Sequence, residues 1–275
     1  MPLHQRVICS TISFRRLTLD AALRQIADLG FTRIDLGALP GVCDHVPYDL
    51  TEEAVVEVAS TLRSSGLAVR SINADVGDLN RPLDSDGRAA RKQHLERLVD
   101  LAVQVNAPAI VLPCGSPGHA PIRELGTDIP LIAEELRRAS RFSTVHGVEI
   151  WVESQHSGRL CHDLDRAGQL IDALRGSGVR SVLDLSHVVA SGDDPLTWID
   201  RYASEVAHTH IRDARRDDIH LTPGNGDVDF AAAIAALDAA GYTGDFSLEL
   251  ETADVIDAER PGATARAGQL ISSLL

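Results

Sequence analysis

EIWVESQ (149–155) is a short apolar run that ends close to a glutamate, and RSVLDLSH (180–187) is a similar run with an aspartate. Short runs of this kind, rich in valine and isoleucine, are typical of buried strands. The stretch between them, LDRAGQLIDALRG (164–176), has apolar residues at helical spacing. This order of strand, helix and strand predicts two parallel strands that lie side by side.

The same alternation continues along the whole chain, without a linker or a low-complexity segment. The expected strands cover 7–14, 32–39, 68–75, 109–115, 149–155, 180–187, 206–213 and 245–251. The expected helices cover 19–30, 51–66, 91–105, 129–142, 164–176, 195–203 and 230–241. This pattern predicts an α/β fold, a single (β/α)8 TIM barrel, with residues 1–275 forming one domain.

An open doubly wound sheet is the main alternative architecture. Such a sheet usually carries a glycine-rich phosphate-binding turn directly after its first strand. The corresponding segment, STISFRRLTL (10–19), contains no glycine. The barrel is therefore the favoured fold.

Four side chains that can bind metal lie in the last four expected strands: Glu153, Asp184, His210 and Glu249. They are 31, 26 and 39 residues apart, and each spacing is about one strand, one helix and their loops. Functional groups of a TIM barrel lie at the C-terminal ends of its strands, so we expect all four at one mouth.

Each of these residues also has a structural interpretation, such as a helix cap for Asp184 or a core histidine for His210. The set as a whole points to a cation. Three carboxylates in a half-buried mouth repel one another unless protons or a cation neutralise them. The oxygen-rich donor set favours one divalent ion, Mn2+ first, with Mg2+, Co2+, Fe2+ and Zn2+ as alternatives.

The overall charge excludes two classes of partner. The chain has 40 acidic and 26 basic residues, a formal net charge of −14. Nucleic acids and anionic membranes attract clustered lysine and arginine, so we expect neither as a partner. No apolar run approaches the ~18 residues of a membrane span, and MPLHQRVICS (1–10) lacks the apolar core of a signal peptide. We therefore expect a cytoplasmic protein.

Motifs in the C-terminal half resemble the sugar-phosphate isomerase/epimerase family, the xylose isomerase-like TIM barrels. The segments are WVESQHSG (151–158), SVLDLSHVVASG (181–192), HTHIRDA (208–214), HLTPGNGDVDF (220–230) and SLELE (247–251). The resemblance extends over essentially the whole chain. The family includes ketose 3-epimerases, hydroxypyruvate isomerase, inosose dehydratase, dehydroshikimate dehydratase and endonuclease IV.

The resemblance implies that Glu153, Asp184, His210 and Glu249 are the metal ligands. It also implies that His187, in the D-x-x-H pattern, and His220, just before the PGNG turn, contact substrate oxygens.

Two residues depart from the family pattern. Arg212 stands where relatives have a lysine, and alternation places it on the same side of its strand as His210. It would hold a substrate anion, or pair with Asp213 or a neighbouring acid. His220 stands near a turn where epimerases often have an arginine, a departure that weakens the case for a ketohexose.

Three further residues are candidates for substrate contact because they lie in loops after expected strands. His156 and Arg159 follow Glu153, and His119 lies in the loop after the fourth expected strand.

The expected chemistry is proton transfer at carbon. A divalent ion chelated by two substrate oxygens polarises a carbonyl and acidifies its α-proton. Glu153 and Glu249, on opposite faces of the substrate, would then act as base and acid through an enediolate. The expected enzyme is a metal-dependent isomerase or epimerase of a small ketose or related polyol.

Four alternative functions share part of this pattern: a dehydratase, an endonuclease IV-like nuclease, a non-catalytic metal-binding protein and xylose isomerase itself. A dehydratase (hydro-lyase) of the inosose or dehydroshikimate type shares the enolate and needs one more acid, for which His187 or His220 would serve. Endonuclease IV-like cleavage conflicts with the net charge of −14, and a non-catalytic metal-binding protein would not need two glutamates free to move protons. Lys92, the only lysine, lies in an expected helix, which argues against the lysine-assisted hydride shift of xylose isomerase. The expected partner is a small sugar or cyclic polyol; a homo-oligomer is left open.

Overall fold

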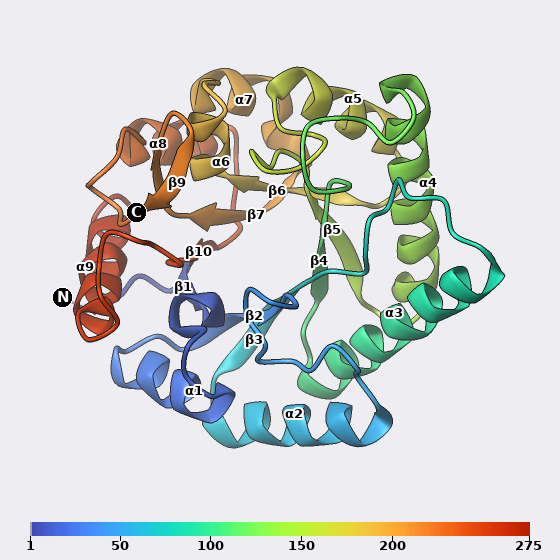
Figure 1. The fold of residues 1–275 in the computed structure, drawn as a ribbon. Coiled ribbons are helices and arrows are strands. Elements are labelled where there is room, and N and C mark those ends of the chain that lie inside the picture. The colour runs from blue at the N-terminus through green and yellow to red at the C-terminus, as the bar shows by residue number, and fades with distance from the viewer. Residues whose placement is uncertain (1) are drawn as a thin grey trace.

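The computed structural model describes residues 2–275 and has a closed barrel of parallel strands at its centre (Figure 1). Around the barrel the order is β1, β10, β7, β6, β5, β4, β3, β2. The strands are β1 Val7–Ser10, β2 Arg33–Ala38, β3 Ala68–Ala74, β4 Ala109–Pro113, β5 Glu149–Glu153, β6 Arg180–Asp184, β7 Val206–Ile211 and β10 Phe246–Leu248. The expected (β/α)8 TIM barrel is confirmed.

Helices form a ring outside the strands (Figure 1). They are α1 Leu19–Asp28, α2 Glu52–Ser65, α3 Ser85–Val105, α4 Leu125–Thr144, α5 Leu164–Leu174, α6 Leu185–Ala190, α7 Pro195–Tyr202, α8 Phe230–Ala239 and α9 Arg260–Ser272. Two short 3-10 helices are η1 Thr11–Phe14 and η2 Ala203–Glu205. Among residues 2–275, none of the helices combines the length and the apolar composition needed to cross a bilayer.

Helix α9 was not predicted from the sequence. Its buried face consists mainly of small residues, among them Ala263, Ala267 and Gly268, with Ile271 at the end. An apolar stripe made of small residues gives a weak periodic signal, so the pattern was not recognised.

Several strands are shorter than predicted. The first expected strand turns into η1 after Ser10, and the seventh ends at Ile211. The sixth ends at Asp184, because the carboxylate of Asp184 accepts the backbone N–H groups of Ser186 and His187 and so caps α6. Expected strand residues therefore lie in η1, in α6 and in the segment that follows β7.

A β-hairpin follows β7 and was also not predicted. It pairs β8 Asp213–Arg215 with β9 Asp218–Leu221 in antiparallel register. The carboxylate of Asp213 accepts the N–H groups of Gly224 (2.8 Å), Gly226 (2.9 Å) and Val228 (3.1 Å) in the loop beyond the hairpin. A Cβ at Gly226 would lie 2.3 Å from Oδ1 of Asp213, so only glycine fits there.

Alternation along β5 sets which side chains enter the barrel. Ile150 and Val152 belong to the main apolar core, which includes residues of the surrounding helices. Trp151 belongs to a separate small cluster with residues of β4, β6 and β7. Because successive side chains point to opposite faces, Glu153 lies on the inner side with Trp151.

Asp245, one residue before β10, joins the starts of three strands. It accepts hydrogen bonds from Arg33 Nη1 (2.9 Å) and Nη2 (2.6 Å) and from Arg70 Nε (2.8 Å). The guanidinium of Arg70 also lies 4.5 Å from the ring centre of Trp151. The Asp245 side chain is 6% exposed, so these contacts form a buried ionic plug.

We expect Asp245→Asn to lower the free energy of unfolding by about 2 kcal/mol, because two arginines lose the charge that compensates them. Urea titration followed by circular dichroism measures this. The control is Asp20→Asn, whose pair with Arg24 is exposed and should contribute less than about 0.5 kcal/mol. Equal losses of unfolding free energy in the two variants would contradict a stabilising role for the Asp245 ion pairs.

Candidate metal centre

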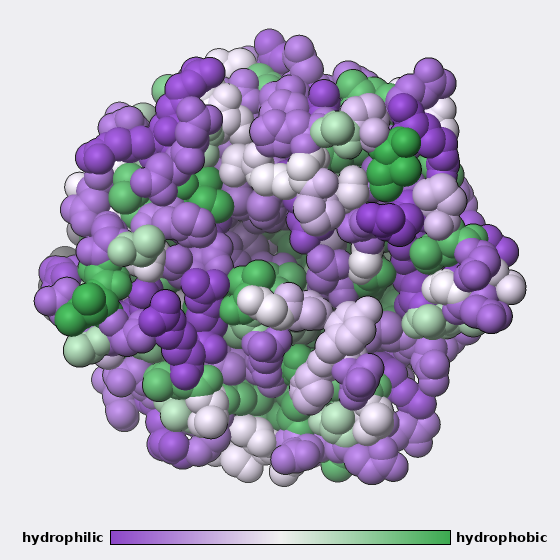
Figure 2. Space-filling view, viewed as in Figure 1, coloured by the Kyte–Doolittle hydropathy of each residue, from purple (hydrophilic) through white to green (hydrophobic). Residues whose placement is uncertain are grey.

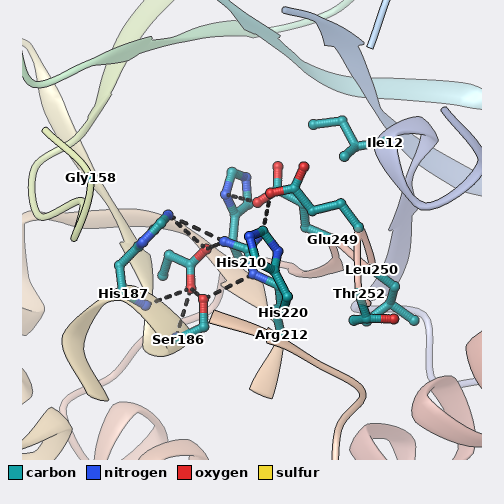
Figure 3. A network of polar contacts seen from close by, with 12 residues as sticks. Ile12, Gly158, Ser186, His187, His210, Arg212, His220, Glu249, Leu250 and Thr252 are labelled. Atoms are coloured by element: carbon teal, nitrogen blue, oxygen red, sulfur yellow. Dashed lines mark hydrogen bonds and ion pairs between the residues drawn. The ribbon is translucent and has the colours of Figure 1, made fainter. Parts of the chain in front are cut away.

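The four expected ligand residues converge at the ends of four neighbouring strands. Glu153 and Asp184 are the last residues of β5 and β6, His210 is next to last in β7, and Glu249 directly follows β10. One ligand-capable atom from each lies within 4.8 Å of the others. Nδ1 of His210 is 3.3 Å from Oε1 of Glu153 and 3.4 Å from Oε2 of Glu249. Figure 3 shows His210 and Glu249 within one polar network at the mouth.

The two oxygens of Asp184 have different surroundings. Oδ1 accepts the N–H of Ser186 (2.7 Å) and the N–H of His187 (3.3 Å). Oδ2 is 3.2 Å from Nη2 of Arg212 and 3.8 Å from Nε2 of His187. The cap on α6 thus fixes the carboxylate and leaves Oδ2 directed at charged and polar side chains.

The pKa values of the two glutamates are shifted in opposite directions by their surroundings. Burial raises the pKa of Glu249 to about 8, and the nearby Glu153 and Asp184 add to this against the attraction of His210 and Arg212. Burial also disfavours the charge on Glu153, but His187, His210 and His156 outweigh it and hold its pKa well below the usual range.

The histidine between them is held in its charged form. Burial alone would lower the pKa of His210, yet Glu249, Asp35 and Glu153 raise it well above the usual value. The carboxylates around His210 therefore stabilise a positive charge at this position. Buried carboxylates of this number around one imidazole fit a divalent cation by donor chemistry.

Arg212 is a buried cation beside the four residues, only 1% exposed. Its guanidinium forms ion pairs with Asp184 and Glu251, and Nε donates to Ser186 Oγ (3.1 Å). Of the two roles expected for it, these contacts match the pairing with neighbouring acids. Asp213, named as one such acid, instead binds the loop after the hairpin.

His187 lies between Arg212 and the loop after β5 (Figure 3). Its Nε2 is 3.2 Å from Nη2 of Arg212, and its Nδ1 is 2.9 Å from Oγ of Ser157. Because arginine only donates, Nε2 accepts from Arg212, and Nδ1 accepts the backbone N–H of Ser157 (3.3 Å). Burial, with the repulsion of Arg212, lowers the pKa of His187 to about 3, so the ring is neutral.

The other substrate-contact candidates fall into two groups. His156 stacks on His187 with ring centres 3.8 Å apart, and Arg159 donates to Asp75 Oδ2 at 2.9 Å. Both line the mouth. His119 and His220 are exposed, and of residues 2–275 the cavity lining includes neither of them. Nε2 of His119 contacts the carbonyl of Ser157 (2.7 Å), and His220 lies on β9.

The mouth encloses a cavity of about 150 Å3 with two kinds of wall. The polar wall is made by Glu153, His156, Arg159, His187, Arg212 and Glu249. Apolar residues of the same lining include Ile12, Leu39, Pro40, Val42 and Leu112. Hydrophilic side chains cover most of the face in Figure 2, which is hollowed near its centre. The cavity can accommodate a small molecule with polar groups.

Sequence reasoning missed two residues of the site, Asp35 and Asn73. Oδ2 of Asp35, on β2, lies 3.2 Å from Nε2 of His210. Asn73, on β3, donates through Nδ2 to Oε1 of Glu249 (3.0 Å). Asp35 carries the same sequence signal as Glu249, an acid between strand-forming apolar residues, and this signal could have identified it.

Comparison with known proteins establishes the family. The model for xylose isomerase-like TIM barrels matches residues 23–273, and the chain belongs to this family. An inosose dehydratase of Geobacillus thermodenitrificans is 27% identical over 139 residues, 44% of this chain and 46% of that protein. The chain thus spans about half the length of the curated relatives it matches.

Solved structures share the fold at low sequence identity. The apo form of 3-keto-D-glucoside 4-epimerase, YcjR, from E. coli has a TM-score of 0.75 and 18% identity, covering 96% of this chain and 99% of that one. The IOLI protein with a binding zinc atom has a TM-score of 0.78 and 16% identity, covering 98% and 99%.

We expect Glu249→Gln to stabilise the metal-free protein in a pH-dependent way. The pKa of Glu249 in the folded protein is about 8 against an ordinary value of 4.5, so ionisation costs stability as pH rises between these values. The gain in unfolding free energy should be absent below pH 4.5 and reach at least about 1 kcal/mol at pH 8, since one pKa unit is worth about 1.4 kcal/mol.

Denaturant titrations from pH 4 to pH 9 in the presence of a chelator measure this gain. Glu57→Gln, on the exposed face of α2, is the control and should show none. A gain for Glu249→Gln that does not change with pH would contradict the electrostatic origin.

Proposed function

We propose that this protein is a divalent-metal-dependent isomerase or epimerase of a small ketose or related polyol. The observation that carries the proposal is the placement of Glu153 and Glu249 beside one atom, His210 Nδ1, at 3.3 and 3.4 Å. Both glutamates also line the cavity. Membership of the xylose isomerase-like family supports an enzyme acting on a sugar or polyol.

Glu153, Asp184, His210 and Glu249 would hold the metal. The three carboxylates and one imidazole favour a hard ion, and Mn2+ is our first choice. The zinc atom in the IOLI protein makes Zn2+ the main competitor. When bound, the cation supplies polarisation of a substrate carbonyl, which makes the neighbouring C–H more acidic.

The two glutamates would carry the proton. One carboxylate removes a proton from the carbon next to the carbonyl, and the electron pair moves onto oxygen to give an enediolate. The other glutamate returns a proton to the opposite face, which inverts the carbon. If the proton instead goes to the neighbouring carbon, the hydroxyl proton of the enediolate passes between its two oxygens and the carbonyl moves. In the reverse direction the two residues exchange roles.

The surroundings of each glutamate suit this task. Oε1 of Glu249 accepts from Asn73, which leaves Oε2 on the side of His210. Oε2 of Glu153 lies 3.9 Å from His156 Nε2 and 4.0 Å from His187 Nε2. Each carboxylate is therefore oriented by neighbours while it faces the cavity. The neutral His187 would hydrogen-bond a substrate hydroxyl.

A dehydratase is the second candidate, and the match to inosose dehydratase favours it. The first step is the same removal of a proton. The electron pair then expels a hydroxyl group from the β-carbon, and an acid protonates that group so that it leaves as water. His187 would be this acid, because it lines the cavity beside Glu153.

Glu153→Gln and Glu249→Gln should each lower kcat at least about 1,000-fold, since each removes one of two proton carriers. The assay is a panel of ketoses and cyclic polyols in D2O with metal-loaded protein. Deuterium entering a ketose at an α-carbon supports the isomerase or epimerase. A new enone absorbance with loss of water supports the dehydratase instead.

His119→Ala is the matched control, because His119 is exposed and outside the cavity lining. It should retain wild-type turnover. Full activity in either glutamine variant would remove that glutamate from the mechanism.

Metal removal should lower thermal stability. A ligand at 100 times its Kd adds about 2.7 kcal/mol to the folded state, which corresponds to a Tm increase of about 5 °C or more in a chain of this size. Differential scanning fluorimetry with a chelator, and then with added Mn2+ or Zn2+, measures the change. In Asp184→Asn the increase should be smaller, and an equal increase there would place the ion elsewhere.

A further inference from the structure

Asp35 is a buried carboxylate directly behind His210. The residue is 0% exposed, and its Oδ2 lies 3.2 Å from Nε2 of His210. No backbone or hydroxyl group of residues 2–275 donates to this oxygen. A buried carboxylate needs a donor. Nε2 of His210 also has no hydrogen-bond partner within residues 2–275, so two buried unpartnered atoms lie 3.2 Å apart.

Two features aim Asp35 at this position. Its other oxygen, Oδ1, accepts from Ser71 Oγ on the neighbouring strand at 2.8 Å. The register between β2 and β3 also shifts between Ile34 and Asp35, which leaves one extra residue on β3 and pairs Asp35 with Ser71. Irregularities of this kind change the direction of a side chain next to functional sites.

The second imidazole near Asp35 offers no alternative donor contact. His208 lies one inward position below His210 on β7, with its ring centre 5.5 Å from that of Trp151. Neither ring nitrogen of His208 has a hydrogen-bond partner within residues 2–275. His208 belongs with Asp35 and His210 to one cluster of ligand-capable atoms within 4.8 Å of one another. Nε2 of His210 approaches Oδ2 of Asp35 to 3.2 Å, so this contact is the one that orients a residue of the site.

We propose that Asp35 is a positioning residue that keeps the proton of His210 on Nε2 and leaves the lone pair of Nδ1 for the cation. This inference rests on the proposed metal site. Nδ1 is the nitrogen that faces Glu153 and Glu249, whereas Nε2 points to Asp35. A carboxylate that accepts from the far nitrogen of a histidine ligand fixes both its tautomer and its ring orientation.

The test compares the Mn2+ affinity of chelator-stripped variants by isothermal titration calorimetry. In Asp35→Asn the amide oxygen can still accept from Ser71, and the NH2 group then faces Nε2. This favours the tautomer with the proton on Nδ1, so we expect Mn2+ to bind 10- to 100-fold more weakly, roughly the effect of losing such a partner. Ser71→Ala keeps the charge and should weaken binding less.

Asp128→Asn is the matched control. Asp128 is also 0% exposed, has one carboxylate oxygen without a partner among residues 2–275, and binds Asn80 outside the site. It should bind Mn2+ like the wild type. Mn2+ affinity within twofold of wild type in folded Asp35→Asn would overturn the inference.

A second measurement does not depend on how the variants fold. Long-range 1H–15N NMR spectra of the Zn2+-loaded wild type should show His210 with its proton on Nε2. A proton on Nδ1 would overturn the inference while leaving metal binding intact. A wild-type protein that binds neither Mn2+ nor Zn2+ would instead overturn the proposed function and this inference together.

Discussion

The site depends on one electrostatic constraint, the meeting of three carboxylates at a single imidazole inside a largely closed mouth. Glu153, Asp184 and Glu249 come from three different strand ends and cannot all be charged there without compensation. The protein supplies part of it through His210 and Arg212, whose pKa values are both raised despite burial. The strands thus assemble an arrangement that is unfavourable by itself, and its natural complement is a cation. The proposed chemistry uses the same acids.

The fold could be predicted because each barrel strand is a short apolar run with a helical pattern beside it. Residues 149–153 and 180–184 show this most clearly, and the barrel follows from their repetition. The features that the sequence did not predict include strand ends and the hairpin after β7. The end of β6 depends on Asp184 capping α6, and the hairpin after β7 depends on backbone donors reaching Asp213. Such contacts join residues outside any periodic pattern, so the hydrophobic pattern cannot reveal them.

The four acidic and imidazole residues of the site were identified from spacing, whereas their surroundings were not. Spacing predicts which strand ends meet, because parallel strands share one mouth. It does not predict that β3 contributes Asn73, or that a register shift between β2 and β3 pairs Asp35 with Ser71. Spacing also does not predict whether a loop side chain is exposed. His119 was therefore predicted to contact substrate, although its side chain lies on the surface. The role of every one of these residues stays a prediction.

Strand β7 has little freedom to change its length. His210 and Arg212 point to one side and Asp213 binds the loop that follows, so three attachments are made within four positions. Inserting or deleting a single residue in the strand would turn all of them to the wrong side at once, because the side-chain period is two. The segment after β2 supplies Leu39 and Val42 to the cavity, and its backbone–backbone hydrogen bonds within the described residues are local, such as that from the N–H of Cys43 to the carbonyl of Leu39 (2.8 Å). Evolution can therefore reshape the cavity by lengthening loops there, while β7 tolerates only exchanges of one amino acid for another.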